Sequence, residues 1–304
     1  MKTSKPLNHT NDTRLLRDTL PCVIAGLFLG TGSALAAPPG TIPFGVYDPG
    51  GSFSDDAEVT IEHVFLPWDG VDLGTLRAAD AYARERDRTL LVTVEPWIWG
   101  APQTPSDLRD DVLSGRRDTT MRGICRVLET LESPVTLRWA QEMDNPNGHF
   151  PWSMWAPADH IEAFQRMINV CREVAPGLRV MWSPAGEDGM QDYYPGNDYV
   201  DVIGLSVFGA QDFGRDHLGG EQDYAETLGP RYDRAIGFGK PIIVAELGFV
   251  GDDTYLADWY QTIRMPDDRF QALEAVVYFN RQEVFPWPFD FGLPDWRNSA
   301  QQGN

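Results

Sequence analysis

Eight apolar runs, rich in β-branched and aromatic residues, recur along the chain and constrain its fold more than any other feature. The runs cover residues 41–48, 60–68, 89–97, 135–143, 178–185, 200–209, 241–248 and 273–280. Because they are mostly hydrophobic rather than alternating, they are typical of parallel strands that are buried on both faces.

Amphipathic helices are predicted between several of these runs, over residues 72–87, 119–132, 157–175 and 223–239. Alternating strands and helices predict a parallel sheet covered by helices. Eight strands in roughly 260 residues match a single-domain, closed (β/α)8 barrel of the α/β class. A doubly wound open sheet is the competing architecture, but the segment YDPGGSFSD at 47–55 lacks the glycine pattern expected of its first turn.

Residues 1–36 have the pattern of a secretion signal. Four basic residues precede the apolar run CVIAGLFLGTGSALA, which closes on the small residues Ala34 and Ala36. The run is too short for a comfortable membrane span. The sequence therefore predicts a secreted or periplasmic protein without a membrane segment in its mature form, with residues 37–304 as one catalytic domain. An uncleaved anchor is the alternative.

The formal net charge of −20 repels nucleic acid and anionic lipid and favours a neutral ligand. Cys125 and Cys171 fall in predicted helices, and their spacing leaves open whether they are buried thiols or one disulfide. The histidines are scattered without the spacing of metal ligands, so neither a metal nor a cofactor is predicted. We expect a monomer.

Three glutamates stand where predicted strands end. Glu95, Glu142 and Glu246 close the third, fourth and seventh runs. In a (β/α)8 barrel the carboxyl ends of the strands face one mouth, where the chemistry takes place. An unpaired buried carboxylate costs several kcal/mol, so strand ends seldom carry one without a function. The neighbouring tryptophans, which add aromatic walls typical of a sugar-binding cleft, are Trp68, Trp97, Trp99, Trp152, Trp155 and Trp182.

Glu142 and Glu246 form the pair that cleavage of a glycosidic bond requires, one carboxyl protonated and the other ionised. Strands four and seven can bring two carboxyls to about 5 to 5.5 Å, the separation of a retaining mechanism. Arg138 can keep a neighbouring carboxylate ionised. The alternative is that these glutamates are satisfied strand-end carboxylates.

The tryptophans also have two interpretations. Trp152 and Trp155 lie in a loop with proline and histidine, which favours exposure and a sugar-platform role. Trp182 lies at the end of a strand, where core packing is the alternative to substrate binding.

The motifs LRWAQEMDNPNGHFPW, YYPGNDYVDVIGLSVFG, LLVTVEPW and KPIIVAELG resemble family 26 of the glycoside hydrolases, within the clan of retaining (β/α)8 enzymes. The resemblance runs from about residue 42 to 290. It implies that Glu142 is the general acid/base and Glu246 the nucleophile. It also implies a basic residue near the pair, a sugar platform and glycone contacts; the positions that match these are Arg138, Trp152, Glu95 and Trp97.

Two positions depart from the family pattern. Gln141 stands where mannanases of the family have histidine, which weakens an assignment to mannan. Phe208 stands where a tyrosine usually bonds the nucleophile, so another donor is needed, and Tyr278 is the candidate.

These features predict a retaining endo-β-glycosidase for a neutral β-linked polysaccharide, such as β-mannan or mixed-linkage β-glucan. Two alternatives remain: hydrolysis of the cell's own exopolysaccharide during export or remodelling, and glycan binding without catalysis.

Overall fold

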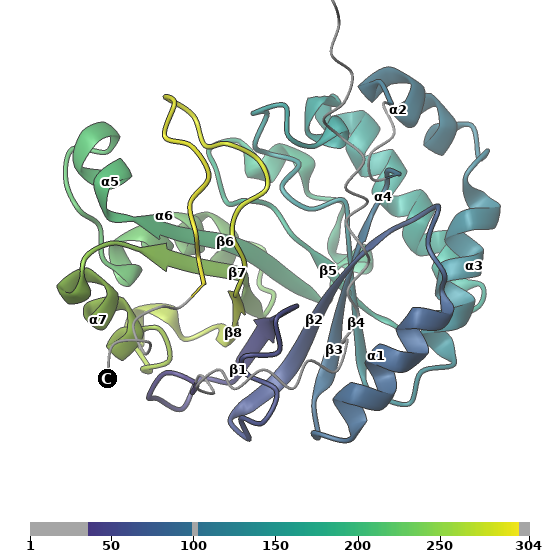
Figure 1. Ribbon diagram of the computed structural model, residues 1–304. Coiled ribbons are helices and arrows are strands. Elements are labelled where there is room, and N and C mark those ends of the chain that lie inside the picture. The colour runs from purple at the N-terminus through teal and green to yellow at the C-terminus, as the bar shows by residue number, and fades with distance from the viewer. Residues whose placement is uncertain (1–35, 99–102, 298–304) are drawn as a thin grey trace, which may run out of the picture.

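The computed structural model describes residues 36–98 and 103–297. Residues 1–35 of the predicted signal, and Trp99, lie outside these ranges. Eight parallel strands close into a barrel in chain order (Figure 1), which confirms the predicted (β/α)8 fold. The strands are β1 (Phe44–Tyr47), β2 (Val59–Pro67), β3 (Thr89–Glu95), β4 (Val135–Trp139), β5 (Arg179–Trp182), β6 (Val202–Ala210), β7 (Ile242–Val250) and β8 (Leu273–Phe279).

Helices surround the barrel, and the four that the sequence predicted are confirmed as α1, α3, α4 and α6. Three shorter helices, α2, α5 and α7, were not predicted, because they carry too few turns for a clear apolar period. The α-helices are α1 (Gly74–Arg84), α2 (Pro105–Leu113), α3 (Asp118–Glu129), α4 (Pro157–Arg172), α5 (Gln211–His217), α6 (Tyr224–Ile236) and α7 (Asp253–Thr262). The short 3-10 helices are Pro151–Met154, Met190–Tyr193, Asn197–Tyr199 and Asp268–Phe270.

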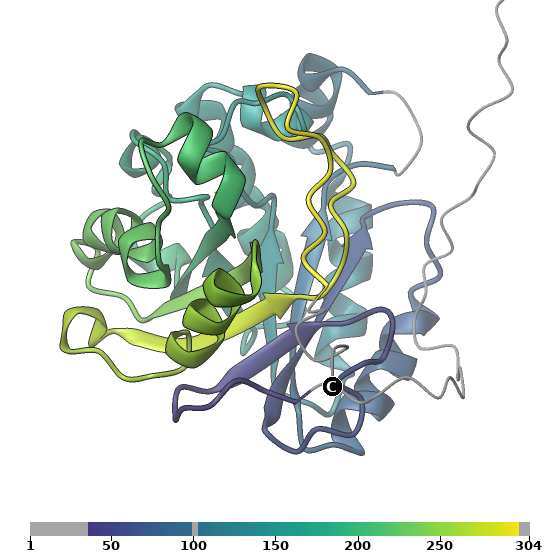
Figure 2. The same ribbon diagram turned by 60° about the vertical axis from the view of Figure 1, so that its left-hand side comes forward.

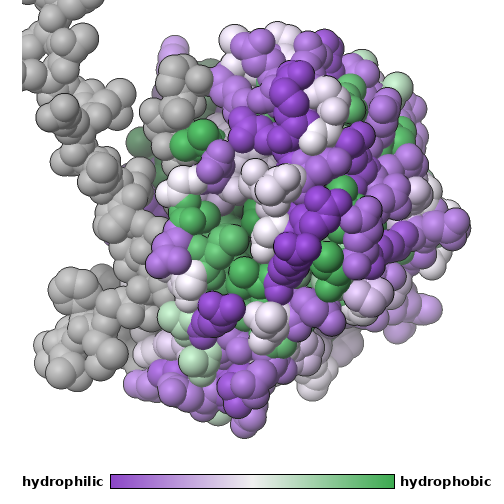
Figure 3. Space-filling view, turned by 90° about the vertical axis from the view of Figure 1, so that its right-hand side faces the viewer, coloured by the Kyte–Doolittle hydropathy of each residue, from purple (hydrophilic) through white to green (hydrophobic). Residues whose placement is uncertain are grey.

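Two apolar cores follow from the alternation of side chains along each strand. The larger core lies between the sheet and the helices. The smaller one fills the interior of the barrel and includes Leu91, Met181, Ile243, Ala245 and Val277. The helix-covered face in Figure 3 is hydrophilic over most of its area, with hydrophobic residues gathered near its centre. This is the expected surface for amphipathic helices that turn their apolar side toward a barrel.

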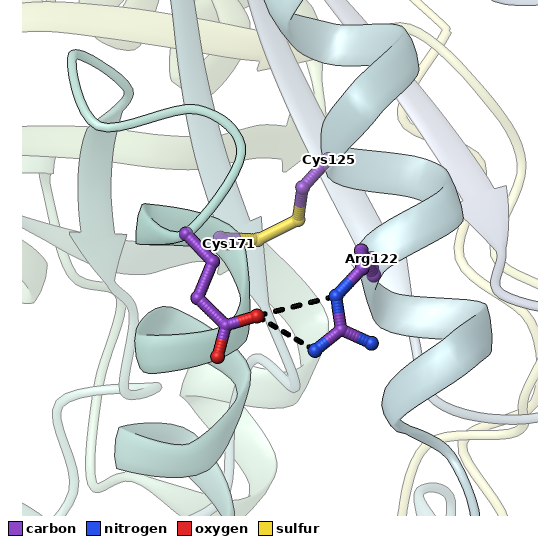
Figure 4. Close-up of a disulfide and its surroundings, with 4 residues drawn as sticks. Arg122, Cys125 and Cys171 are labelled. Atoms are coloured by element: carbon purple, nitrogen blue, oxygen red, sulfur yellow. Dashed lines mark hydrogen bonds and ion pairs between the residues drawn. A yellow bond between two sulfur atoms is a disulfide. The ribbon is translucent and has the colours of Figure 1, made fainter.

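A disulfide joins the two helices that flank β4. Cys125 of α3 and Cys171 of α4 are bonded, with their Cα atoms 5.2 Å apart, and Arg122 lies beside them (Figure 4). The Arg122 guanidinium pairs with Glu173 at 2.7 Å. The structure thus answers the question that cysteine spacing left open.

Within residues 36–98 and 103–297, no helix is both long and apolar enough to cross a bilayer.

Candidate active site

A polar layer lies above the apolar interior of the barrel, toward the carboxyl ends of the strands. Four polar residues each lie two positions after a residue whose side chain points into the barrel: His63, Thr93, Arg138 and Ser183. Because side chains alternate along a strand, these four side chains also point into the barrel. All four side chains are buried. They form one hydrogen-bonded layer, since Thr93 Oγ1 lies 2.7 Å from His63 Nε2 and accepts from Arg138 Nη1 at 3.3 Å.

Arg138 connects this layer to Glu246. Its Nη1 lies 2.5 Å from Glu246 Oε1, and its Nε donates to Ser183 Oγ at 2.8 Å. The pairing between β7 and β8 shifts between Val244 and Leu247, an irregularity of the kind that re-aims side chains near active sites. Glu246 therefore reaches the interior although Ala245, its neighbour in sequence, also belongs to the interior core.

Glu142 lies beyond the strand that was expected to carry it. The fourth run predicted a strand to residue 143, but β4 ends at Trp139. Ala140 and Glu142 then adopt left-handed backbone angles, with φ of 50° and 55°. Such angles are costly for residues other than glycine and concentrate at functional sites. Arg138 and Glu142 are four residues apart, a spacing that would place them on the same face of a continuous strand, but the backbone turns before Glu142.

The contacts of Glu142 and the segment after it are well defined. The Glu142 amide donates to the carbonyl of Ser183 at 2.8 Å. Asp144 accepts hydrogen bonds from the backbone amides of residues 185, 186 and 187, at 2.6 to 2.9 Å, and so clamps the loop after β4 to the loop after β5. Ser206 Oγ donates to Glu142 Oε1 at 2.5 Å, and Ser206 pairs directly with Glu246 in the sheet.

The two carboxyl groups have different surroundings. The pKa of Glu142 is raised to about 8, first by burial and then by the charge of Glu246, while the Ser206 hydroxyl opposes the shift. Burial also raises the pKa of Glu246, but there the Arg138 guanidinium, as neighbouring charge and hydrogen-bond donor, opposes the shift. A carboxyl in contact with a cation favours the ionised form, and one facing another carboxylate favours the protonated form. The site therefore suits a protonated Glu142 beside an ionised Glu246.

His63 contributes no charge to this arrangement. Burial, together with the nearby Arg138 cation, holds the pKa of His63 well below its ordinary value, so the imidazole is neutral.

Glu95, Gln141 and Trp97 meet at the mouth, as the sequence placed them. Gln141 Nε2 donates to Glu95 Oε1, and Trp97 Nε1 donates to Glu95 Oε2, both at 2.9 Å. Gln141 Oε1 and Arg138 Nη2 are buried without a hydrogen-bond partner among the described residues. Buried polar atoms of this kind are rare, and here one acceptor and one donor are left unsatisfied beside Glu95 and Glu246.

The predicted exposure of Trp152 and Trp155 was wrong. Trp152 is fully buried, because its Nε1 donates to the carbonyl of Gln141 at 2.6 Å and its ring stacks on Phe150. Trp155 is 4% exposed and donates to the carbonyl of Pro105. Both rings support the loop after β4 instead of facing solvent.

Trp182 is also fully buried. It packs edge-on against Tyr194 and Phe238, which is the core alternative to the substrate contact predicted for it. Trp68 is buried as well. Among the described tryptophans of the predicted rim, Trp97 alone is partly exposed.

Tyr278 does not act as the expected donor to Glu246. Its hydroxyl donates to the carbonyl of Trp296 at 2.5 Å. Phe208, which stands where a tyrosine was expected, instead packs against Phe279 and Trp296. Gly248 makes room for this packing, since a Cβ there would lie 2.8 Å from the Phe208 ring. The Arg138 guanidinium is the donor that Glu246 uses.

The chain after β8 forms a feature that the sequence did not predict. Residues 281–296, which we term the arm, run out and back as two antiparallel segments bridged at Gln282–Asp295 and Trp287–Gly292. The arm rises above the barrel in both views (Figures 1 and 2). Its Phe285 ring lies 4.4 Å from His149 of the loop after β4, and the charge of Glu283 reaches Glu246. The arm therefore forms part of the wall of the mouth.

His63, Thr93, Ser183 and Ser206 are the site residues that the sequence did not reveal. Side chains alternate between the two faces of a strand, so counting every second residue from the apolar positions inside the barrel would have placed the first three there. Across residues 36–98 and 103–297, no three His, Cys, Asp or Glu side chains are grouped to hold a metal ion.

Comparison with known proteins adds relatives in sequence and in fold. No protein-family model matches the chain. The chain is 29% identical over 125 residues to a β-1,3-xylanase of an Alcaligenes species and, to the same degree, to one of a Vibrio species. The matched part is 38% of this chain and 25% and 26% of those proteins. The chain thus spans about a quarter of the length of these curated relatives.

Solved structures with the same fold include GH26C of Muricauda, with a TM-score of 0.58, 13% identity and coverage of 82% of this chain and 79% of that one. An exo-β-1,4-mannosidase of an Opitutaceae bacterium has a TM-score of 0.56 and 16% identity, over 86% of this chain and 56% of that one. These likenesses confirm the barrel. The partial sequence likeness to two β-1,3-xylanases agrees with the predicted resemblance to glycoside hydrolases.

Proposed function

We propose that this protein is a retaining glycoside hydrolase, with Glu246 as nucleophile and Glu142 as general acid/base. The observation that carries the proposal is the opposed environment of two carboxyl groups at one barrel mouth. Glu246 contacts a buried guanidinium, whereas Glu142 faces a hydroxyl and the charge of Glu246.

In the first step, a carboxylate oxygen of Glu246 attacks the anomeric carbon while Glu142 gives its proton to the departing glycosidic oxygen. The carbon–oxygen bond breaks, the leaving sugar takes the proton, and a glycosyl ester forms on Glu246. That ester carries no charge, so the part of the rise in the Glu142 pKa that comes from the charge of Glu246 is lost. Glu142 then accepts a proton from a water molecule whose oxygen attacks the same carbon. The ester bond to Glu246 breaks, which frees the carboxylate and releases the sugar with retained configuration. Neither step requires a metal or a cofactor.

The proposed substrate class is a neutral β-linked polysaccharide cleaved internally, by an exported, monomeric enzyme. The acidic composition favours an uncharged ligand, and Glu95, Gln141 and Trp97 supply hydrogen-bonding groups and an aromatic face. The sequence relatives are β-1,3-xylanases, so β-1,3-xylan is tested beside β-mannan and mixed-linkage β-glucan.

The direct test is release of new reducing ends from these three polymers and from a bacterial exopolysaccharide. We expect one polymer to be cleaved, with the product keeping the β configuration when first released, as NMR can follow. Inversion of configuration would contradict the double displacement. Binding to a polymer without cleavage of any would favour the non-catalytic alternative.

Replacing Arg138 with methionine is expected to move the acidic limb of the pH profile of kcat/KM to higher pH, by roughly one unit or more. The sign follows from the ion pair: without the guanidinium, nothing opposes the desolvation of Glu246, its pKa rises, and more alkaline conditions are needed to ionise it. Arg138→Lys keeps the charge and serves as the matched control, with a smaller shift. An unmoved acidic limb in a methionine variant with native circular dichroism would contradict the role of Arg138.

A further inference from the structure

Exposed apolar side chains concentrate on the arm and on the segment that follows α5. Large hydrophobic residues with high exposure in the described part of the chain include Leu218 (54%), Val284 (59%), Phe289 (69%) and Leu293 (47%). Single exposed apolar residues are ordinary, but a contiguous group on one surface indicates a binding site.

The aromatic rings of this surface are ordered against one another. Phe289 stacks on His217, with ring centroids 4.5 Å apart and an angle of 16° between the planes. Phe213 lies 5.0 Å from Trp287 and 5.3 Å from Phe291, edge to face in both cases. Phe289 keeps most of its surface in solvent because His217 covers only one face of the ring. We term Phe213, His217, Trp287, Phe289 and Phe291 the arm platform.

The backbone of the arm holds Phe289 in an unfavourable conformation. Its φ is 60°, which is a rare value for a bulky residue, and Asp290 follows with 55°. The Trp287 amide donates to the carbonyl of Gly292 at 2.8 Å, so the turn is closed below these residues. Such strain persists where the surrounding structure fixes it, and it is found at ligand-binding positions.

Aromatic contacts connect the arm platform to the mouth. Phe208 lies 6.3 Å from Phe279 at the end of β8 and 6.4 Å from Trp287 of the arm. A cavity of about 210 Å³ adjoins the arm platform through Phe291 and is also lined by Leu293, Gln211, Asp212 and Gly251. Apolar faces beside a few polar groups are the usual composition of a ligand pocket.

We propose that the arm platform binds a part of the polysaccharide chain that extends beyond the catalytic mouth, as a neutral β-linked glycan segment. This inference rests on the proposed function, because the glycan segment at the arm platform belongs to the same polysaccharide that the mouth is proposed to bind. A sugar ring presents an apolar face of C–H groups that stacks on Phe289, and its hydroxyls reach the polar lining of the cavity. The acidic composition of the protein disfavours an anionic ligand at the same place.

The test compares polymer with short substrate in the full-length protein carrying Phe289→Ala and His217→Ala together. We expect kcat/KM on the polymer to fall about 3- to 10-fold, while kcat/KM on an aryl glycoside stays unchanged. Met265→Ala is the matched control, because Met265 is 50% exposed but follows α7, away from the arm. Equal effects on both substrates, or none on the polymer, would overturn the proposal.

Binding is measured separately by depletion onto the insoluble polymer, with the arm changes placed in a Glu246→Ala background. This readout needs no turnover, so it distinguishes failure of the platform from failure of the proposed chemistry. We expect weaker retention of the arm variant than of Glu246→Ala alone. Sedimentation is run in parallel: a dimeric parent that becomes monomeric on substitution would show that the surface holds a second copy of the chain, and would overturn the proposal.

Discussion

Glu246→Ala is expected to lower kcat by roughly ten-thousand-fold or more, the size of effect seen when a covalent nucleophile is removed. Alanine has no carboxylate oxygen, so it can neither form the glycosyl ester nor pair with the Arg138 guanidinium. Glycan retention is expected to persist, but the free energy of unfolding falls, because the buried Arg138 guanidinium loses its carboxylate partner; native circular dichroism shows that the variant is folded.

The control for this variant is Glu274→Ala. Glu274 lies at the opposite end of β8 and forms an exposed ion pair with Arg179 at 2.8 Å, an interaction of small value. Glu274→Ala is expected to leave turnover unchanged, which would show that the loss of kcat in Glu246→Ala comes from the missing nucleophile and not from the loss of any glutamate. Polymer hydrolysis near the parent rate by Glu246→Ala would exclude this residue as the nucleophile.

Glu142→Ala is expected to reduce kcat on the polymer by about 100- to 10,000-fold, the usual contribution of a general acid. The loss depends on the leaving group. A sugar leaves as a poor alkoxide and needs the proton, whereas an activated aryl group departs without it. Rates of glycosyl-ester formation measured on aryl glycosides of falling leaving-group pKa therefore approach the parent rate.

Azide provides a second, independent readout for Glu142→Ala. It attacks the glycosyl ester without needing a base, so it is expected to accelerate turnover and to yield a glycosyl azide of retained configuration. Equal losses on good and poor leaving groups, with no effect of azide, would remove Glu142 from the acid/base role.

The fold could be predicted from sequence because its main determinant is repeated. Each of the eight apolar runs overlaps one strand over most of that strand's length, and the long amphipathic segments are helices. Strand ends were less predictable: the fourth run continues through Met143 in composition, but β4 stops at Trp139. Apolar composition does not report the left-handed angles at Ala140 and Glu142, because neither residue is a glycine.

The site was predictable where a residue type is rarely buried without function, as with Glu142, Glu246 and Arg138. It was not predictable where one residue type has two common uses. Trp152 lies in a polar, proline-containing loop, which suggests exposure, but its indole N–H satisfies the carbonyl of Gln141 and the ring is enclosed. The arm was missed because its ring contacts join segments far apart in sequence, such as Phe213 and Trp287.

The position of the arm in the chain has a consequence for how this protein can diversify. β8 already pairs with β1, so the barrel is closed before the arm begins. Trp296 anchors the far end of the arm, fully buried beside Phe208. Insertions or exchanges between these two fixed points leave the sheet and the Arg138–Glu246 contact in place, provided that Glu283, whose charge reaches Glu246, is kept. Selection can therefore alter which polymers the surface accepts while the bond-breaking groups stay as they are, and a designer can graft other arms at the same two points.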